Sequence, residues 1–131
     1  MRLVLILAGL ANLAVGLLAL IAPDTFFDQI GHYGVENSHY VGDNGSFTAA
    51  AGIGLLLAVN RPSWRAPLLY VGAIWFGLHA LNHLFDIGEA KSDARGITDT
   101  VSLALIGVFS ALTAREAERL RDSRPLGEAP R

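Results

Sequence analysis

The chain has 131 residues, of which 52% are hydrophobic and 17% are charged, and its formal net charge at pH 7 is −2. A soluble domain carries about 25% charged residues, so this composition is shifted toward that of membrane proteins. The absence of cysteine excludes disulfides, thiolate metal sites and thiol redox chemistry within the chain. The small negative charge, without a basic patch interleaved with aromatic residues, argues against nucleic acid as a partner.

Four segments are apolar and long enough to span a bilayer core, which takes about 20 residues. In chain order they cover about residues 3–22, 44–59, 66–85 and 97–114. Their apolar runs are continuous and rich in leucine and alanine, whereas half-buried strands alternate. The length fits a single domain. We therefore predict an all-α fold, a four-helix transmembrane bundle of up-down topology over residues 1–115.

The first segment has a second interpretation as a cleaved signal peptide, because Arg2 precedes it and small residues lie in "ALIA" at its end. The apolar core of a signal peptide is about 7–15 residues long, and this segment is longer. We therefore expect a retained helix, ended by Pro23 and Asp24.

The charged residues divide between the two sides of such a bundle. Arg2, the loop 60–65 and the tail from Arg115 carry most of the arginines, whereas the loops 23–43 and 86–96 are acidic. The positive-inside rule then places both termini and the loop 60–65 in the cytoplasm. The charged tail, residues 116–131, is expected to extend the last helix and to be partly disordered after Arg124.

The loop 23–43 mixes aromatic and acidic residues, a pattern that suits a short interfacial helix on the outer surface. The second spanning segment carries small residues every four positions, namely Ser46, Ala50, Gly54 and Ala58. Such a stripe allows the close approach of another helix. We expect it to pack within the bundle or against a protein partner or second copy of the chain, with lipid around the rest.

A polar cluster is predicted at the outer ends of the second and third helices. His79, His83 and Asp86 share one helix face, and His39, Asp43 and Ser46 repeat the same spacing. Because these two helices run in opposite directions, the two sets are expected at similar depth, with Asp99 close by. Ionisable groups in hydrocarbon are costly and face partners inside a bundle.

Three interpretations of this cluster stay open. Imidazoles four residues apart, completed by carboxylates, can bind a divalent transition metal such as zinc or iron, which makes His79, His83, Asp43, His39 and Asp99 the candidate ligands. Asp86 and Ser46 would extend the polar cluster. The same groups can instead relay protons, or form an interhelical hydrogen-bond network with no ligand.

No catalytic motif is present, and enzymatic activity stays open. "HALNH" lacks the glutamate that follows the first histidine of metalloproteases. The nucleophile elbow, the phosphate loop and the dinucleotide fingerprint are also missing.

The layout resembles the small four-helix bacterial membrane proteins of the DoxX-like group. The matching features are the four-span pattern over about residues 1–115, Pro23 with Phe26 and Phe27 after it, and the small-residue second helix. Some members are linked to redox systems as quinol-oxidising or maturation subunits. The resemblance implies a role at the outer face associated with redox chemistry or quinones, but no catalytic residue carries over individually.

Three functions follow as hypotheses. The first is an accessory or assembly subunit of a larger membrane complex, such as a respiratory or redox complex, because the chain is small and has no soluble catalytic domain. The second is a small membrane protein that handles a metal, a quinone or protons with the polar cluster. The third is a carrier of a lipophilic small molecule, which requires a cavity between the helices.

Overall fold

The computed structural model describes residues 1–123, and the disorder expected after Arg124 lies outside them. Within this range the regular elements are helical: α1 (Arg2–Ile21), α2 (Pro23–Phe26), the π-helix η1 (Phe27–Gly31), α3 (Ser38–Ala58), α4 (Pro62–Phe85), the 3₁₀ helix η2 (Ile87–Glu89) and α5 (Asp93–Asp122). The predicted all-α class is confirmed for this part of the chain. Short helices also occupy part of the predicted interfacial loop.

Three long helices extend beyond the apolar segments that predicted them, because local capping rather than hydropathy sets where a helix begins. The side-chain oxygen of Asn37 accepts hydrogen bonds from the backbone N–H groups of His39 and Tyr40, which starts α3 at Ser38. Pro62 starts α4 at the position that favours proline. The Ser92 side chain caps α5, which continues through the charged segment to Asp122.

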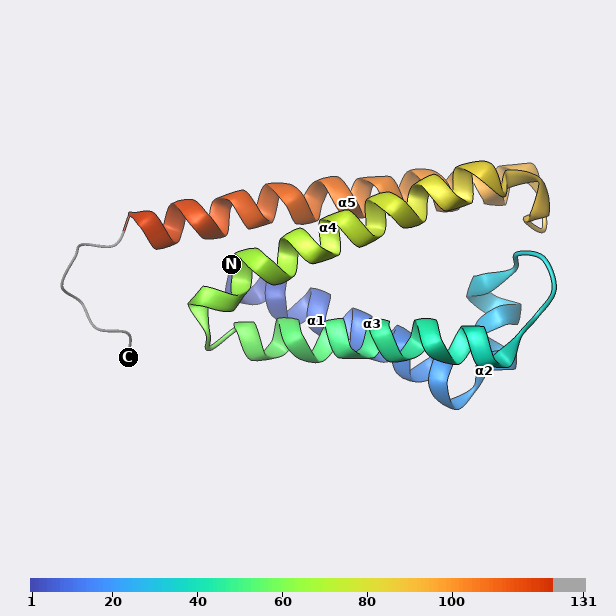
Figure 1. The fold of residues 1–131 in the computed structure, drawn as a ribbon, viewed down its shortest axis with the longest axis horizontal. Coiled ribbons are helices and arrows are strands. Elements are labelled where there is room, and N and C mark those ends of the chain that lie inside the picture. The colour runs from blue at the N-terminus through green and yellow to red at the C-terminus, as the bar shows by residue number, and fades with distance from the viewer. Residues whose placement is uncertain (124–131) are drawn as a thin grey trace.

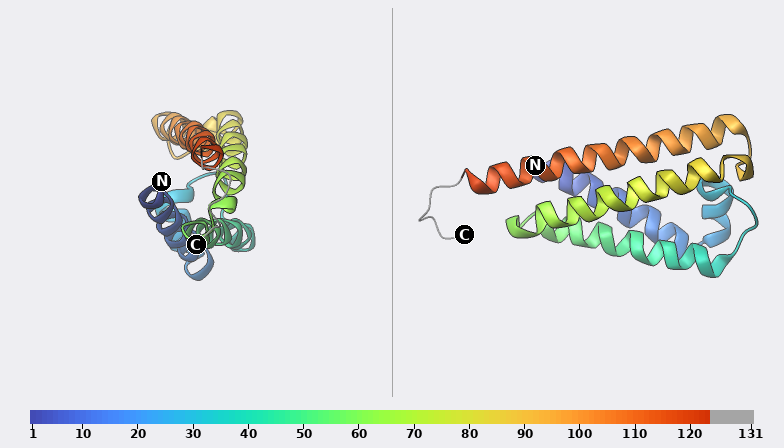
Figure 2. Two further views of the ribbon diagram at one scale, coloured as in Figure 1. Left: turned by 90° about the vertical axis from the view of Figure 1, so that its left-hand side faces the viewer. Right: turned by 45° about the horizontal axis from the view of Figure 1, so that its top comes forward.

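The four long helices form two antiparallel hairpins, α1 with α3 and α4 with α5 (Figures 1 and 2). The turn after α3 joins them at the end of the molecule where α1 begins. We call this the basic end, since Arg2, Arg61, Arg65 and the arginines of α5 from Arg115 onward lie toward it. At the opposite, acidic end, which carries residues 23–43 and 86–99, the hairpins separate (Figure 1).

Glycines bring α1 and α3 into backbone contact. A Cβ atom on Gly16 would lie 2.7 Å from the carbonyl oxygen of Gly45, and one on Gly52 would lie 2.7 Å from that of Gly9. The glycines of each helix are therefore seven residues apart on the shared face. The predicted stripe is borne out only in its second half: Ala58 is buried in the bundle and Gly54 lies against Leu68, whereas Ser46 and Ala50 are exposed. The contact with α1 is made instead by the buried Gly45, Ala49 and Gly52.

The two hairpins meet in a buried cluster toward the basic end. All four long helices contribute to it: Leu5 from α1, Leu55 and Ala58 from α3, Ala66 and Leu69 from α4, and Ala114 and Ala117 from α5. Arg65 closes the connecting turn by donating hydrogen bonds to the carbonyl oxygens of Ala58, at 3.0 Å, and Val59, at 2.6 Å. The Tyr70 hydroxyl donates to Glu118 at 2.8 Å and ties α4 to α5. This end is the joint between the hairpins.

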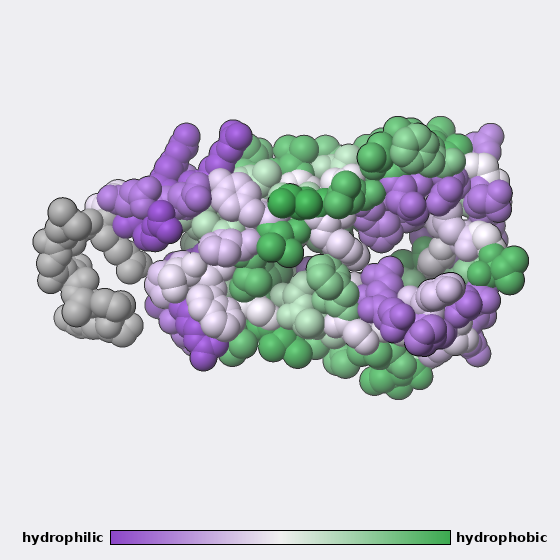
Figure 3. Space-filling model, viewed as in Figure 1, coloured by the Kyte–Doolittle hydropathy of each residue, from purple (hydrophilic) through white to green (hydrophobic). Residues whose placement is uncertain are grey.

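Three described helices, α1, α4 and α5, are long and apolar enough to cross a membrane, which suggests membrane association. Their outer faces expose large apolar side chains, and apolar surface covers much of the middle of the molecule (Figure 3). The predicted second span, α3, is not among the three. Its first half carries Asp43, Asn44 and Ser46 among small residues, and these lower its hydropathy.

Candidate functional site

A cavity of about 530 Å³ lies where the hairpins separate at the acidic end. This volume falls within the range of about 300–1,000 Å³ that is typical of small-molecule sites. We call it the acidic-end cavity; its lining includes Phe26, Phe27, Ile30, Tyr33, Tyr40, Val41, Asn44, His79, Asn82, His83, Asp86, Arg95, Asp99 and Ser102.

The two sides of the cavity differ in chemistry. Most of its apolar lining comes from α2, η1 and α3, with Phe26, Phe27, Ile30 and Val41. The lining from α4 and α5 is mainly polar and includes His79, Asn82, His83, Asp86, Arg95, Asp99 and Ser102. A molecule that has one apolar face and one polar edge would satisfy both sides.

A short backbone link brings Tyr33 from the first hairpin to the second. Tyr33 forms an isolated antiparallel bridge with Ala90, and the Gly34 N–H donates to the carbonyl oxygen of Glu89 at 3.3 Å. Gly34 has a φ of +60°, a conformation that suits glycine. The loop therefore reaches across the separated end and places the Tyr33 ring against α4.

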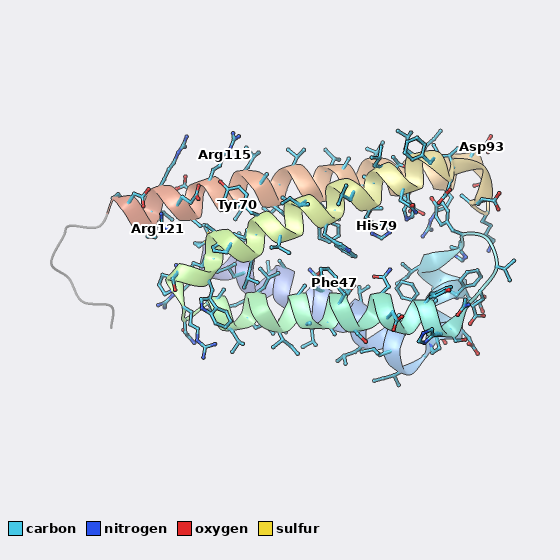
Figure 4. The ribbon with its side chains drawn as sticks, viewed as in Figure 1. Phe47, Tyr70, His79, Asp93, Arg115 and Arg121 are labelled. Atoms are coloured by element: carbon cyan, nitrogen blue, oxygen red, sulfur yellow. The ribbon has the colours of Figure 1, made fainter. Side chains whose placement is uncertain are left out.

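Five rings form a continuous ladder, made of Phe47, Trp75, His79, His83 and Tyr33. The Trp75 ring centroid lies 5.3 Å from that of Phe47 and 5.1 Å from that of His79. Tyr33 packs edge-on against His83 with centroids 4.2 Å apart. Figure 4 shows Phe47 and His79 pointing into the space between α3 and α4. The ladder thus connects both hairpins beside the cavity.

The two histidines of the ladder face each other directly. Their Nε2 atoms are 3.0 Å apart, so one ring donates a hydrogen bond that the other ring accepts. The Nδ1 atoms of His79 and His83 and the Tyr33 hydroxyl are buried without a hydrogen-bond partner among the described residues. Unsatisfied buried polar atoms are rare in proteins and costly.

Carboxylates complete the polar side of the cavity. Arg95 Nε donates to Asp99 at 2.9 Å, and Asn82 donates to Asp86 at 3.1 Å. Burial, and then the negative charge of Asp99, raise the pKa of the Tyr33 phenol above its usual value of 10.0. Tyr33 therefore stays neutral at physiological pH and keeps its hydroxyl proton.

The structure brings together some of the predicted site residues and separates others. His79, His83, Asp86 and Asp99 all line the acidic-end cavity. His39 and Asp43 pair with each other at 3.6 Å on exposed surface, with side chains 80% and 68% exposed, and do not line the cavity. Ser46 is also exposed and donates to the carbonyl oxygen of Gly42. Within residues 1–123, no three histidine, aspartate or glutamate side chains are grouped so that they could hold a metal ion.

The face of α3 that lines the cavity is not the face that carries His39, Asp43 and Ser46. His39, Asp43 and Ser46 do share one face of the helix, as their spacing requires. The residues that line the cavity are instead Tyr40, Val41 and Asn44, on an adjacent face. The expected meeting of Asp43 with the histidines of α4 therefore does not occur in this structure.

Most of the lining was not predicted from the sequence, including the polar residues Tyr33, Asn82 and Arg95. The pairs Asn82/Asp86 and Arg95/Asp99 have i,i+4 spacing, which was visible in the sequence as a helical signal. Tyr33 had no such signal, because its position depends on the bridge to Ala90.

Comparison with known proteins found no match to this chain among protein-family profiles, curated proteins or solved structures.

Proposed function

We propose that the chain is a four-helix integral protein of the bacterial inner membrane, with both termini in the cytoplasm. The support is the three apolar helices, together with α3, which packs antiparallel along α1 over its length. The arginines of the basic end would then face the cytoplasm, by the positive-inside rule. The acidic end would face outward. The relationship to DoxX-like proteins is proposed on this layout alone.

The proposed function is to bind a small lipophilic molecule in the acidic-end cavity. The observation that carries this proposal is a cavity of ligand size with an apolar side and a polar side. The carrier hypothesis requires such a cavity between the helices. His79, His83 and Tyr33 line it, and each carries a buried polar atom that has no hydrogen-bond partner among the described residues.

Filling the cavity should abolish binding of a lipophilic probe. The probe is 1-aminoanthracene, a neutral fluorescent molecule, titrated into the protein in lipid nanodiscs with empty nanodiscs subtracted. Asn44→Trp puts an indole into the cavity from α3 and should weaken probe binding at least about tenfold. The matched control is Ser46→Trp, two residues away on exposed surface, which should leave binding unchanged. Equal binding by both variants and the parent would contradict the proposal.

The histidine pair supports a second candidate, a metal site. Two Nε2 atoms 3.0 Å apart can ligate one zinc or iron ion, with exogenous ligands in the remaining positions. Elemental analysis of protein purified without chelators should then find about one metal ion per chain. His79→Ala and His83→Ala should each lose it, whereas His39→Ala, in the exposed pair, should keep it. A metal-free parent protein would contradict this candidate.

An accessory role in a larger membrane complex is also retained as a proposal. Its support is the small-residue stripe of Ser46 and Ala50, which the contact with α1 leaves exposed. Recovery of a lone monomer by native mass spectrometry in mild detergent would contradict it.

A further inference from the structure

We propose that the ligand of the acidic-end cavity is an organic cation that carries an apolar group, of the substituted-ammonium class. This inference rests on the proposed function, because it names the chemical class that the same cavity takes. Three features of the described residues carry it: the charge of the polar side, the carboxylate of Asp86, and the aromatic rings opposite.

The charges around the cavity favour a cation. The segments that form the acidic end, residues 23–43 and 86–99, carry eight carboxylates against Lys91 and Arg95. Clefts lined by charge of one sign concentrate ions of the other sign. An anion would meet repulsion on its approach to the cavity.

Within the cavity, Asp86 is the carboxylate that is free to pair with a ligand. Arg95 neutralises Asp99 through an ion pair at 2.9 Å. Asp86 accepts a side-chain hydrogen bond from the neutral amide of Asn82, and the described residues give its carboxylate no cationic partner. The lining therefore carries one uncompensated negative charge among Asp86, Arg95 and Asp99.

The apolar side distinguishes an organic cation from a hydrated metal ion. Phe26, Phe27, Tyr33 and Tyr40 line the cavity. Aromatic faces attract substituted ammonium groups by cation–π interaction, and they also bury apolar carbon. A divalent metal ion would use only the polar side and would leave these rings without a role.

The experiment compares three probes of one shape and different charge, each titrated into the protein in lipid nanodiscs at pH 7. They are benzyltrimethylammonium, its neutral isostere neopentylbenzene, and the anion phenylmethanesulfonate. We expect the cation to bind at least about tenfold more tightly than the other two, which corresponds to about 1.4 kcal/mol. Asp86→Asn should reduce that preference about tenfold and leave the affinity for neopentylbenzene unchanged.

Two variants keep the result interpretable. Asp43→Asn removes the same charge from exposed surface at the acidic end, outside the cavity, and should change the affinity for the cation less than twofold. Asp86→Glu keeps the charge and should preserve the preference, which separates loss of charge from loss of folding. Equal weakening by Asp86→Asn and Asp43→Asn would overturn the role of Asp86, since a diffuse surface charge would then explain the preference.

The outcomes for the two proposals are distinguishable. If all three probes bind equally and Asn44→Trp blocks them, the cation inference fails and the small-molecule function stands. If 1-aminoanthracene and the three probes all fail to bind, both proposals fail.

Discussion

Replacing Gly52 with leucine should separate α1 from α3 and lower the free energy of unfolding by about 3 kcal/mol. A side chain at this position would begin 2.5 Å from the backbone nitrogen of Leu13 and 2.7 Å from the carbonyl oxygen of Gly9. Both neighbours are backbone atoms of a helix, so they cannot move aside as a flexible side chain would. The hairpin would have to open to accept even a methyl group.

The measurement is reversible unfolding in mixed micelles, followed by far-ultraviolet circular dichroism. The matched control is Gly72→Leu in α4, where an added Cβ would meet nothing within 4 Å. That variant should be as stable as the parent or slightly more stable, because glycine disfavours a helix interior by about 1 kcal/mol relative to alanine. Equal losses in both variants would show that backbone contact between α1 and α3 does not hold the hairpin.

The sequence predicted the helical class and the approximate position of each long helix, because these depend on local hydropathy. It predicted their ends less well. Ser92 and Asn37 start their helices through side-chain hydrogen bonds that lie outside the apolar segments. The expected helical extension of the last span into the charged tail is present, since α5 runs to Asp122.

The candidate site could be predicted within one helix but not between helices. His79, His83 and Asp86 share a face of α4, which follows from helical spacing alone. Which face of α3 lies opposite depends on how α3 rotates when it packs on α1. Backbone contacts at Gly45 and Gly52 fix that rotation. They turn Asn44 and Tyr40 toward the cavity and leave Asp43 and His39 on exposed surface.

The same glycine contacts help to explain why a cavity exists. Backbone contact holds α1 and α3 together along their length, while Tyr70 and Glu118 join α4 to α5 near the basic end. The buried cluster that contains Leu5 joins one hairpin to the other at that end. At the acidic end, the loop that contains Tyr33 bridges the two hairpins through its backbone contact with Ala90. The cavity occupies the space that this bridge spans.

Shortening Leu5 to alanine should weaken the joint between the hairpins more than any comparable change on the surface of α1. Leu5 is 0% exposed and contacts the cluster that all four long helices share. Removing a fully buried leucine side chain costs about 3 kcal/mol, from lost burial and the cavity left behind. Leu10→Ala is the matched control, because Leu10 lies on the same helix and is 52% exposed. We expect that variant to stay within about 0.5 kcal/mol of the parent.

We expect the joint to fix the angle between the hairpins as well, so Leu5→Ala should have a second effect that Leu10→Ala lacks. The chain contains no cysteine, and cysteines introduced at the exposed Ile53 in α3 and Val108 in α5 can carry spin labels without competing thiols. The distance distribution between these labels should broaden in Leu5→Ala, because each hairpin stays intact while the angle between them becomes less restricted. Loss of stability with an unchanged distribution would mean that the bridge at Tyr33, rather than the cluster at the basic end, fixes the angle. Probe affinity in the cavity would then depend on Tyr33 and not on Leu5.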